Sequence, residues 1–168
     1  MNKTSRIARI ALIAAAYAVL TLAFPPLSYG PIQLRISEAL CVLPFFMPEA
    51  VAGLTAGCFL ANLIGMSFGM TLPWDVVIGT SATFLAAFWS VRIKNKWLLP
   101  LPAVVVNAIF VGAMLTFVMT EGMEALPLWY NILTVGAGQV IACYGAGLPL
   151  FSVIEKLVKK QDKKENQV

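Results

Sequence analysis

A few charged side chains interrupt an otherwise apolar chain. Arg35 and Glu38 lie three residues apart in the segment GPIQLRISEALCVLPFF, and Asp75 follows a Pro-Trp pair further along. A guanidinium and two carboxylates can hold a polar ligand through charge-assisted hydrogen bonds, or they can pair with each other. The amide and aromatic residues that complete this set of candidate binding residues are Asn62, Asn107, Trp129, Tyr130 and Gln139.

Several kinds of catalytic site lack the residues they need. The sequence has no histidine, which excludes Ser-His and Cys-His catalytic pairs. Its three cysteines, Cys41, Cys58 and Cys143, lie in apolar segments without metal-ligand spacing, which favours packing roles. The sequence also contains no Walker-type phosphate loop. We therefore expect no enzyme activity, no metal site and no cofactor in this chain.

The elements that position these residues are predicted to be membrane helices. The chain has 168 residues, of which 60% are hydrophobic and 12% charged, and its mean hydropathy is +0.83. Soluble domains are about 25% charged. A helix that crosses a bilayer needs about 20 mostly apolar residues, and several apolar runs approach that length. These properties predict an all-α integral membrane protein.

Six apolar segments are expected to form a single membrane domain over residues 1–168. The first segment lacks a convincing cleavage site, so we expect a retained span rather than a signal peptide. The tight connection Met47-Pro48-Glu49 predicts that the second and third spans form an antiparallel hairpin. The predicted spans are 7–24, 33–47, 49–66, 74–91, 98–119 and 129–156, and a basic tail follows at 157–168.

The basic residues predict the orientation of these spans. Eleven of the twelve Lys and Arg residues lie at the N-terminus, in residues 92–96 or at the C-terminus, and six spans place all three regions on one side. The opposite loops contain no Lys or Arg, and their only charges are Glu121 and Glu124, which we expect to be solvated. The positive-inside rule therefore predicts a six-helix bundle with both termini in the cytoplasm. Orientation in the membrane thus accounts for the excess of Lys and Arg over Asp and Glu, and nucleic-acid binding is not needed to explain it.

The candidate residues are all predicted to lie between the outer surface and the midplane. An ionisable residue at the bilayer centre costs about 2.5 kcal/mol or more, so its presence suggests a function. Five of the six predicted spans contribute a polar side chain to the outer half. This predicts a pocket open to the outside, with Trp74, Trp129 and Tyr130 at a level where they can stack on a flat ligand.

Each candidate residue also has an explanation that needs no ligand. Arg35 and Glu38 can pair across one helical turn. Asp75 can cap the helix that begins near it. Trp74 and Trp129 can belong to the aromatic belt at the membrane interface. The amides that can form hydrogen bonds between helices are Asn62, Asn107 and Gln139.

Small residues repeat at four-residue spacing in the first span. Ala11 and Ala15 share one face of the predicted helix, and Ala14 and Ala18 share another. Small residues at this spacing let a second helix approach closely. That helix can belong to a partner protein or to the same bundle, and the sequence leaves both possibilities open.

Three stretches together resemble the QueT family of queuosine-precursor transporters. They are YGPIQLRISEAL (29–40), GLTAGCFLANLIG (53–65) and WDVVIGTSATFLAA (74–87). The resemblance extends over nearly the whole chain. Proteins of this family are substrate-capture (S) components of energy-coupling-factor (ECF) transporters. The resemblance implies a multi-pass six-helix bundle in the bacterial plasma membrane that binds its substrate from outside.

The resemblance also implies partners. An S component docks onto a transmembrane coupling protein (the T component) with two cytoplasmic ATPases, so ATP is used by the partners rather than by this chain. In such S components an alanine-spaced face of the first helix contacts the coupling protein. Ala11 and Ala15 match that pattern best, with Ala14 and Ala18 as the alternative register.

The substrate implied by the resemblance is a 7-deazaguanine such as the aminomethyl precursor of queuosine (preQ1). Glu38 and Asp75 supply two carboxylates for the N–H donors of the base and for an ammonium group, and Arg35 can donate to the base carbonyl. Trp129 or Tyr130 can stack on the ring. The role of each carboxylate is left open. The alternatives are an S component for another vitamin and a stand-alone proton-coupled carrier.

Overall fold

The computed structural model describes residues 2–30, 32–118 and 126–165, apart from the side chains of residues 162, 164 and 165. Every regular element within these residues is helical, which confirms the predicted all-α class. Glu121 and Glu124 lie outside the described residues, as does position 119, the predicted end of the fifth span.

The helical elements follow the order of the predicted spans. Element η1 is a 3₁₀ helix, and η2 and η3 are π-helical segments that continue directly into α5 and α8. The elements are α1 (Lys3–Leu22), α2 (Pro25–Ser28), η1 (Ile36–Val42), α3 (Leu43–Phe46), α4 (Ala50–Ser67), η2 (Asp75–Gly79), α5 (Thr80–Ser90), α6 (Leu101–Val118), α7 (Leu128–Val140), η3 (Ile141–Gly147) and α8 (Leu148–Glu165).

Four helical stretches in the described residues are long and apolar enough to cross a membrane. They are α1, α4, α6 and the continuous stretch that α7, η3 and α8 form. Two further apolar helices, Ile36–Phe46 and Asp75–Ser90, are shorter. Large hydrophobic side chains such as Phe88 and Leu133 are exposed on the outer faces of these helices. A soluble monomer rarely exposes so much apolar surface, whereas lipid accommodates it.

The second predicted span begins later than its apolar pattern suggested. Gln33 has a positive φ of 50°, and Arg35 is extended with φ −91° and ψ 109°, so the helix starts at Ile36 rather than at residue 33. A side chain at positive φ is strained, and such strain persists only where the surrounding structure holds it. Arg35 therefore precedes the helix, and Glu38 lies in its first turn.

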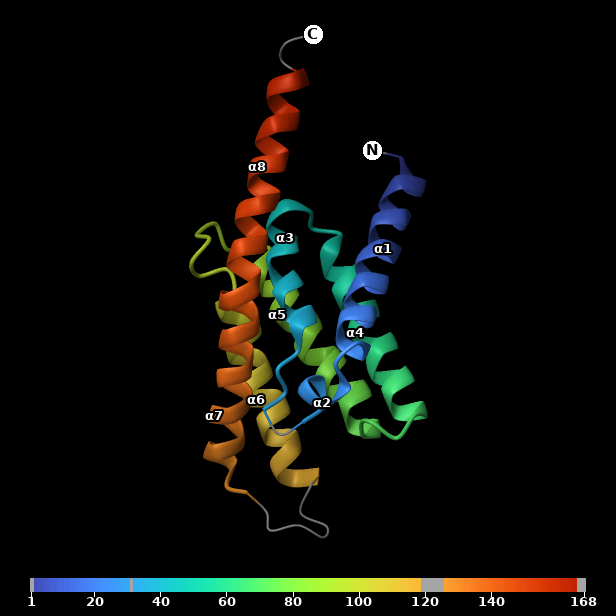
Figure 1. Ribbon diagram of the computed structural model, residues 1–168, viewed down its shortest axis with the longest axis vertical. Helices are drawn as coiled ribbons and strands as arrows, with labels where there is room; N and C mark the ends of the chain where they lie inside the picture. Colours follow the sequence, from blue (N-terminus) through green and yellow to red (C-terminus); the bar gives the residue numbers. More distant parts are fainter. Residues whose placement is uncertain (1, 31, 119–125, 166–168) are drawn as a thin grey trace.

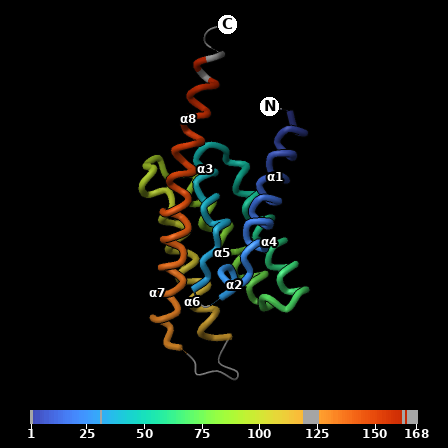
Figure 2. The backbone as a smooth tube through the Cα atoms, viewed as in Figure 1, coloured from blue at the N-terminus to red at the C-terminus, as the bar shows by residue number. Residues whose placement is uncertain are grey.

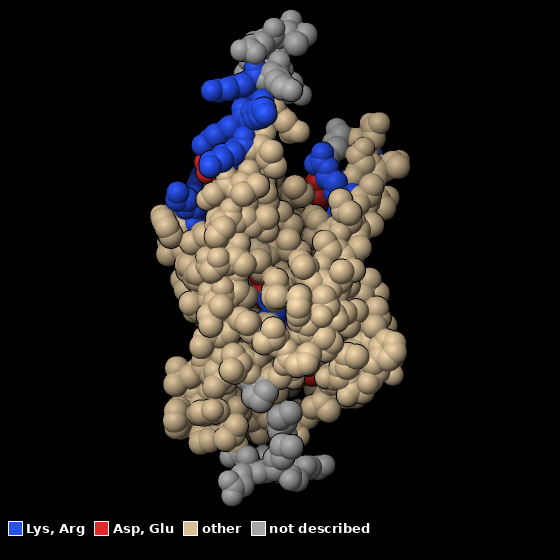
Figure 3. Space-filling model, in the orientation of Figure 1, with Lys and Arg blue, Asp and Glu red and all other residues tan. Residues whose placement is uncertain are grey.

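The helices run back and forth along the long axis of the molecule. Both termini lie at the same end, and the stretch from α7 to α8 runs along nearly the whole length (Figure 1). After α1 the chain turns at α2 and returns through η1 and α3 (Figure 2). Lys and Arg side chains gather at the end that carries the termini (Figure 3). This clustering matches the segregation of charge seen in the sequence.

Close packing of α1 against α4 decides which alanines are covered. A Cβ added at Gly57 would lie 2.8 Å from the carbonyl oxygen of Ala14, so only glycine permits this approach. Ala14 is buried in this contact and Ala18 is buried on the same face of α1, whereas Ala11 and Ala15 remain exposed. The Ala14–Ala18 face thus serves packing within the chain.

Candidate functional site

Arg35 lies at the centre of a buried polar cluster. Its Nη2 is 3.6 Å from Oδ1 of Asp75, and its Nε donates a hydrogen bond of 3.2 Å to the carbonyl oxygen of Ser28. Its guanidinium carbon also lies 5.4 Å from the ring centroid of Tyr29. Arg35 is only 3% exposed and Asp75 only 4%. Buried charges are stable in this setting only when they are paired, and this pair joins the second and fourth predicted spans.

Asp75 uses its two carboxylate oxygens for different contacts. Its Oδ2 accepts hydrogen bonds from the Thr71 hydroxyl at 2.5 Å and from the Leu72 backbone N–H at 3.1 Å. The helix begins at Pro73, so Leu72 is the N-cap and Asp75 the third helical residue, an arrangement like the acidic half of a capping box. Oδ1 faces Arg35. Asp75 therefore caps its helix through one oxygen while the other faces Arg35, so the predicted capping role leaves Oδ1 available.

Asn62 connects α4 to the same cluster. It is fully buried, and its Nδ2 donates a hydrogen bond of 2.8 Å to the backbone carbonyl oxygen of Asp75. Asp75 is the first residue of the π-helical segment η2, and π-bulges frequently occur at functional sites. Gly79 ends that segment, and a Cβ there would lie 3.0 Å from Asn62 Nδ2 and 3.6 Å from Arg35 Nη1. Gly79 therefore forms one wall of the cluster.

Three buried polar atoms in this cluster have no hydrogen-bond partner among the described residues. They are Nη2 of Arg35, Oδ1 of Asp75 and Oδ1 of Asn62. The 3.6 Å between the first two is close enough for charge attraction but too long for a good hydrogen bond. A buried polar atom without a hydrogen bond costs about 1–3 kcal/mol. The cluster can thus accept additional donors and an acceptor from a ligand.

Glu38 lies one 3₁₀ turn beyond Arg35. The Tyr17 hydroxyl donates to Glu38 Oε1 at 2.5 Å, which ties η1 to α1. The Arg35–Glu38 pair that the spacing allowed is not among the ion pairs of the described residues; Arg35 pairs with Asp75 instead. Glu38 is buried, and its carboxylate accepts its hydrogen bond from the phenol of Tyr17, while Arg35 forms no ion pair with it.

Sequence reasoning missed several residues that hold this cluster together. Thr21 on α1 forms a 2.7 Å hydrogen bond with Ser37, and Ser28 donates to the Thr21 carbonyl oxygen at 2.8 Å. Tyr29 donates to the carbonyl oxygen of Ala61 at 2.8 Å, and burial raises the pKa of Tyr29, which keeps it neutral. The available signal was the four-residue spacing of Tyr17 and Thr21, which places both on one face of an apolar helix.

A second polar group borders the Glu38 segment from α6 and α7. Asn107 Nδ2 donates to Gln139 Oε1 at 3.3 Å, and the Cys143 thiol lies 3.6 Å from the same oxygen. Cys143 also lies 3.5 Å from the carbonyl oxygen of Glu38. The two amides thus form a hydrogen bond between helices, next to η1.

The predicted stacking aromatics lie apart from the cluster. Trp129 and Tyr130 are 63% and 41% exposed at the start of α7, and their rings contact each other edge to face at 6.0 Å. Trp74 is also more than half exposed. The structure does not bring these rings over Arg35, and their exposure suits the aromatic belt.

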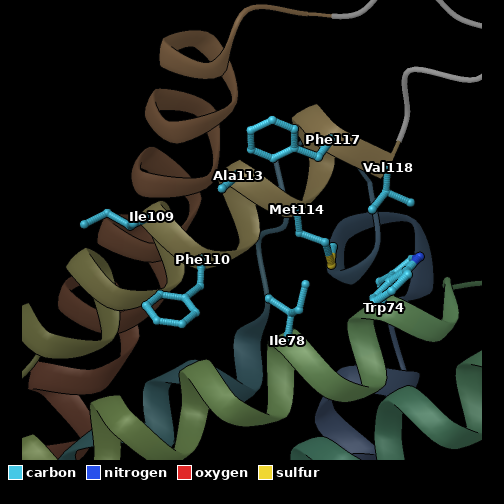
Figure 4. Close-up of a pocket in the computed structure, with 8 residues that line it drawn as sticks. All are labelled: Trp74, Ile78, Ile109, Phe110, Ala113, Met114, Phe117 and Val118. Carbon is cyan, nitrogen blue, oxygen red and sulfur yellow. The ribbon is translucent and has the colours of Figure 1, made fainter.

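An apolar groove of about 840 Å³ lies between η2 and α6 (Figure 4). It offers no charged or amide side chain, so it does not suit a polar ligand. The cavity beside Tyr17 and Glu38 has about 10 Å³, room for one water at most, so a larger ligand reaches these side chains only when their neighbours move apart. The groove is lined by Trp74, Ile78, Ile109, Phe110, Ala113, Met114, Phe117 and Val118.

Comparison with known proteins places this chain among transporters. The family model described as QueT transporter matches residues 7–156, a range that contains the whole polar cluster. The queuosine precursor transporter QueT of Lactococcus lactis subsp. cremoris (strain MG1363) is 35% identical over 86 residues, which is 50% of this chain and 48% of that relative. The matched part thus spans about half the relative's length. No solved structure matches this chain.

The match to the family model confirms the resemblance seen in the motifs. It also supports the expectation that the chain is not an enzyme. The candidate membrane helices agree with a transporter that passes the membrane several times. Because the family model covers nearly the whole chain, from α1 into α8, this multi-pass membrane protein belongs to the QueT transporter family.

Proposed function

We propose that this chain is the substrate-capture component of an ECF-type importer and that it binds a queuosine precursor, a 7-deazaguanine such as preQ1. The observation that carries the proposal is the buried Arg35–Asp75 pair beside Asn62, within a chain of the QueT family. The named relative from Lactococcus lactis supports the substrate class. The absence of a Walker-type loop from the sequence suits a subunit that relies on partner ATPases.

The proposed topology has six membrane segments with both termini in the cytoplasm. Four helices are long enough to cross about 30 Å of hydrocarbon, and the two shorter helices complete the six. The irregular backbone that precedes η1 contains the buried residues Gln33 and Arg35. Non-helical backbone at membrane depth is tolerated where protein buries it or where it lines a cavity, and transporters often place their binding sites at such breaks.

The donor and acceptor groups of the cluster suit a guanine-like base. Such a base presents a carbonyl acceptor and N–H donors along one edge. Arg35 supplies a donor, and the side chains of Asp75 and Asn62 supply acceptors. The Asn107–Gln139 pair borders the same segment and is part of the proposed site. Trp129 and Tyr130 remain candidates for stacking only if they move inward on binding.

The proposed docking face for the T component is the exposed Ala11–Ala15 face of α1. The alternative register, Ala14 and Ala18, is buried within the chain, and Ala14 lies against Gly57 of α4. Ala11 and Ala15 are flanked by exposed apolar side chains, among them Leu12 and Val19. A face of small residues with apolar neighbours allows a membrane helix to approach closely.

A binding experiment on the purified full-length chain tests the substrate. The ligands are the aminomethyl and nitrile 7-deazaguanines, guanine, riboflavin and thiamine. We expect the 7-deazaguanines to bind at least tenfold more tightly than the vitamins, about 1.4 kcal/mol or more. Preferential binding of riboflavin or thiamine would overturn the proposed substrate.

Uptake assays test the ECF mechanism. We expect uptake of the aminomethyl compound by cells that contain the coupling protein and both ATPases, and no uptake by cells that lack them. Vesicles that contain this chain alone, without ATP but with a pH gradient, provide the opposing test. Accumulation in those vesicles would establish a proton-coupled carrier and reject the S-component proposal.

A further inference from the structure

We infer that the two buried carboxylates recognise different parts of the ligand: Asp75, with Asn62 and Arg35, reads the base edge, and Glu38 holds a cationic substituent. This inference rests on the proposed function and assigns the ligand groups within that site. It follows from the different partners that surround the two carboxylates.

The Asp75 carboxylate is arranged to accept hydrogen bonds from a base. Oδ2 is occupied by Thr71 and Leu72, which fixes the side chain, while Oδ1 points to Arg35 without a hydrogen bond. Oδ1 of Asn62 is a second unsatisfied acceptor, and Nη2 of Arg35 is an unsatisfied donor. One donor and two acceptors complement the carbonyl, the ring N–H and the exocyclic amine of a guanine edge.

The side chains of Asp75, Asn62 and Arg35 lie next to one another in the fold. The carboxylate of Asp75 faces Arg35, and its backbone carbonyl accepts the amide of Asn62. Gly79 lies against both Asn62 Nδ2 and Arg35 Nη1. Asn62 Nδ2 is occupied by the Asp75 carbonyl, which leaves Oδ1 as the free atom of that amide.

The Glu38 carboxylate has a different environment. Among the described residues, the Tyr17 hydroxyl donates to it, and no cation forms an ion pair with it. Oε1 of Glu38 accepts from Tyr17, whereas the two unsatisfied acceptors of the polar cluster are Oδ1 of Asp75 and Oδ1 of Asn62, so the pair of acceptors that two N–H donors need lies at Asp75 rather than at Glu38. A buried carboxylate is stabilised most by a positive charge, which an aminomethyl group on the ligand provides.

The spacing of Arg35 and Glu38 allows both contacts with one small ligand. Residues three apart in a 3₁₀ helix lie on the same side, about 6 Å apart along the axis at a rise of about 2.0 Å per residue. Arg35 is the N-cap of η1, and Glu38 lies one turn further on. A bicyclic base is long enough to reach from Arg35 to Glu38, and because both side chains are buried beside a cavity of only about 10 Å³, its entry requires the surrounding side chains to move apart.

Two substitutions measured against three ligands test this assignment. The ligands are the aminomethyl 7-deazaguanine, its nitrile, and the aminomethyl compound without the exocyclic amine of the base. The variants are Glu38→Gln and Asp75→Asn in the full-length chain. Glu155→Gln, which removes an exposed carboxylate paired with Lys159, is the matched control.

The expected result is two separate losses of selectivity. Glu38→Gln should weaken the aminomethyl ligand at least tenfold and leave the nitrile within about threefold. Asp75→Asn should weaken the aminomethyl ligand and the nitrile, which both carry the complete base edge, at least tenfold. Its effect on the ligand that lacks the exocyclic amine of the base should be smaller. Glu155→Gln should change none of the three affinities.

Other outcomes overturn the assignment. It fails if Glu38→Gln weakens the aminomethyl and nitrile ligands equally, or if Asp75→Asn removes the preference for the aminomethyl ligand over the nitrile. If Asp75→Asn does not fold, Asn62→Ala tests recognition of the same base edge. For every variant the ratio of its affinities for two ligands is compared, because that ratio does not depend on the fraction of protein that is folded. If the wild-type chain binds no 7-deazaguanine, the proposed function itself fails, and that result is distinguishable from a lost selectivity.

Discussion

At the scale of single residues, the cluster depends on side chains that perform two tasks. Asp75 caps its helix through one oxygen and faces Arg35 through the other. Asn62 donates to the backbone of the π-helical segment and leaves its own oxygen unsatisfied. The contacts that hold these side chains in place are thus separate from the atoms that are free to bind.

Gly79 provides a test of the cluster at this scale. A methyl group at this position would lie 3.0 Å from Asn62 Nδ2, closer than ordinary contact, and would narrow the space beside Arg35. We expect Gly79→Ala to weaken binding of the aminomethyl 7-deazaguanine about tenfold, with little change in thermal unfolding.

Gly145→Ala is the matched control for that substitution. Gly145 also lies in a π-helical segment, and a Cβ there would meet nothing within 4 Å. The Gly145→Ala variant should bind the aminomethyl 7-deazaguanine with the same affinity as the wild-type chain. Equal losses in both variants would show that the effect comes from the π-helical backbone rather than from crowding of the cluster.

At the scale of elements, α1 presents two faces with different partners. Its inner face packs Ala14 against α4, and Tyr17 and Thr21 on the same side form hydrogen bonds with residues of η1. Its outer face is exposed and apolar around Ala11. The same helix therefore contacts the candidate site on one side and is available to a membrane partner on the other.

A bulky residue on the outer face tests the docking proposal. Ala11→Trp should abolish ECF-dependent uptake while binding of the aminomethyl ligand stays within about twofold, because the side chain of Ala11 is exposed rather than buried in the bundle. The measurement compares uptake by cells with affinity of the purified chain.

Leu133→Trp on α7 is the control for this variant, since Leu133 is also exposed but lies on another helix. It should leave both uptake and binding unchanged. Normal uptake by Ala11→Trp would remove this face as the docking surface, and loss of binding would show that the substitution had disturbed the bundle.

At the scale of the whole molecule, charge and apolar surface define a direction. Both termini and most Lys and Arg residues lie at one end, and the turn between α4 and η2 lies at the other (Figures 1 and 3). The Arg9–Glu49 ion pair, with 3.5 Å between its charged atoms, joins α1 to the start of α4 near the basic end. In the topology that we propose, this basic end faces the cytoplasm.

Cysteine labelling tests that orientation. Cys41, Cys58 and Cys143 are buried, so the wild-type chain should react little with a membrane-impermeant maleimide. Ser67→Cys should be labelled in intact cells, and Asn95→Cys only after the membrane is opened. Labelling of Asn95→Cys in intact cells would contradict the proposed topology.

The sequence by itself determined the class of the protein, its helical segments and the segregation of its charges. These are local properties: lipid tolerates apolar helices and excludes charge, so composition and charge position reveal them. The sequence also identified Arg35, Asp75 and Asn62 as candidates, because buried polar residues are costly and therefore uncommon within apolar segments.

Only the tertiary structure decided which of these residues meet. In the structure Arg35 pairs with Asp75 rather than with Glu38, which is closer to it in the sequence. The structure also shows that Tyr17, within an apolar helix, donates a hydrogen bond to Glu38. It also began the second helix after Arg35, where the strained φ of Gln33 is held by burial. Such pairings depend on which faces of distant helices are covered, and residue spacing along a chain does not contain that information.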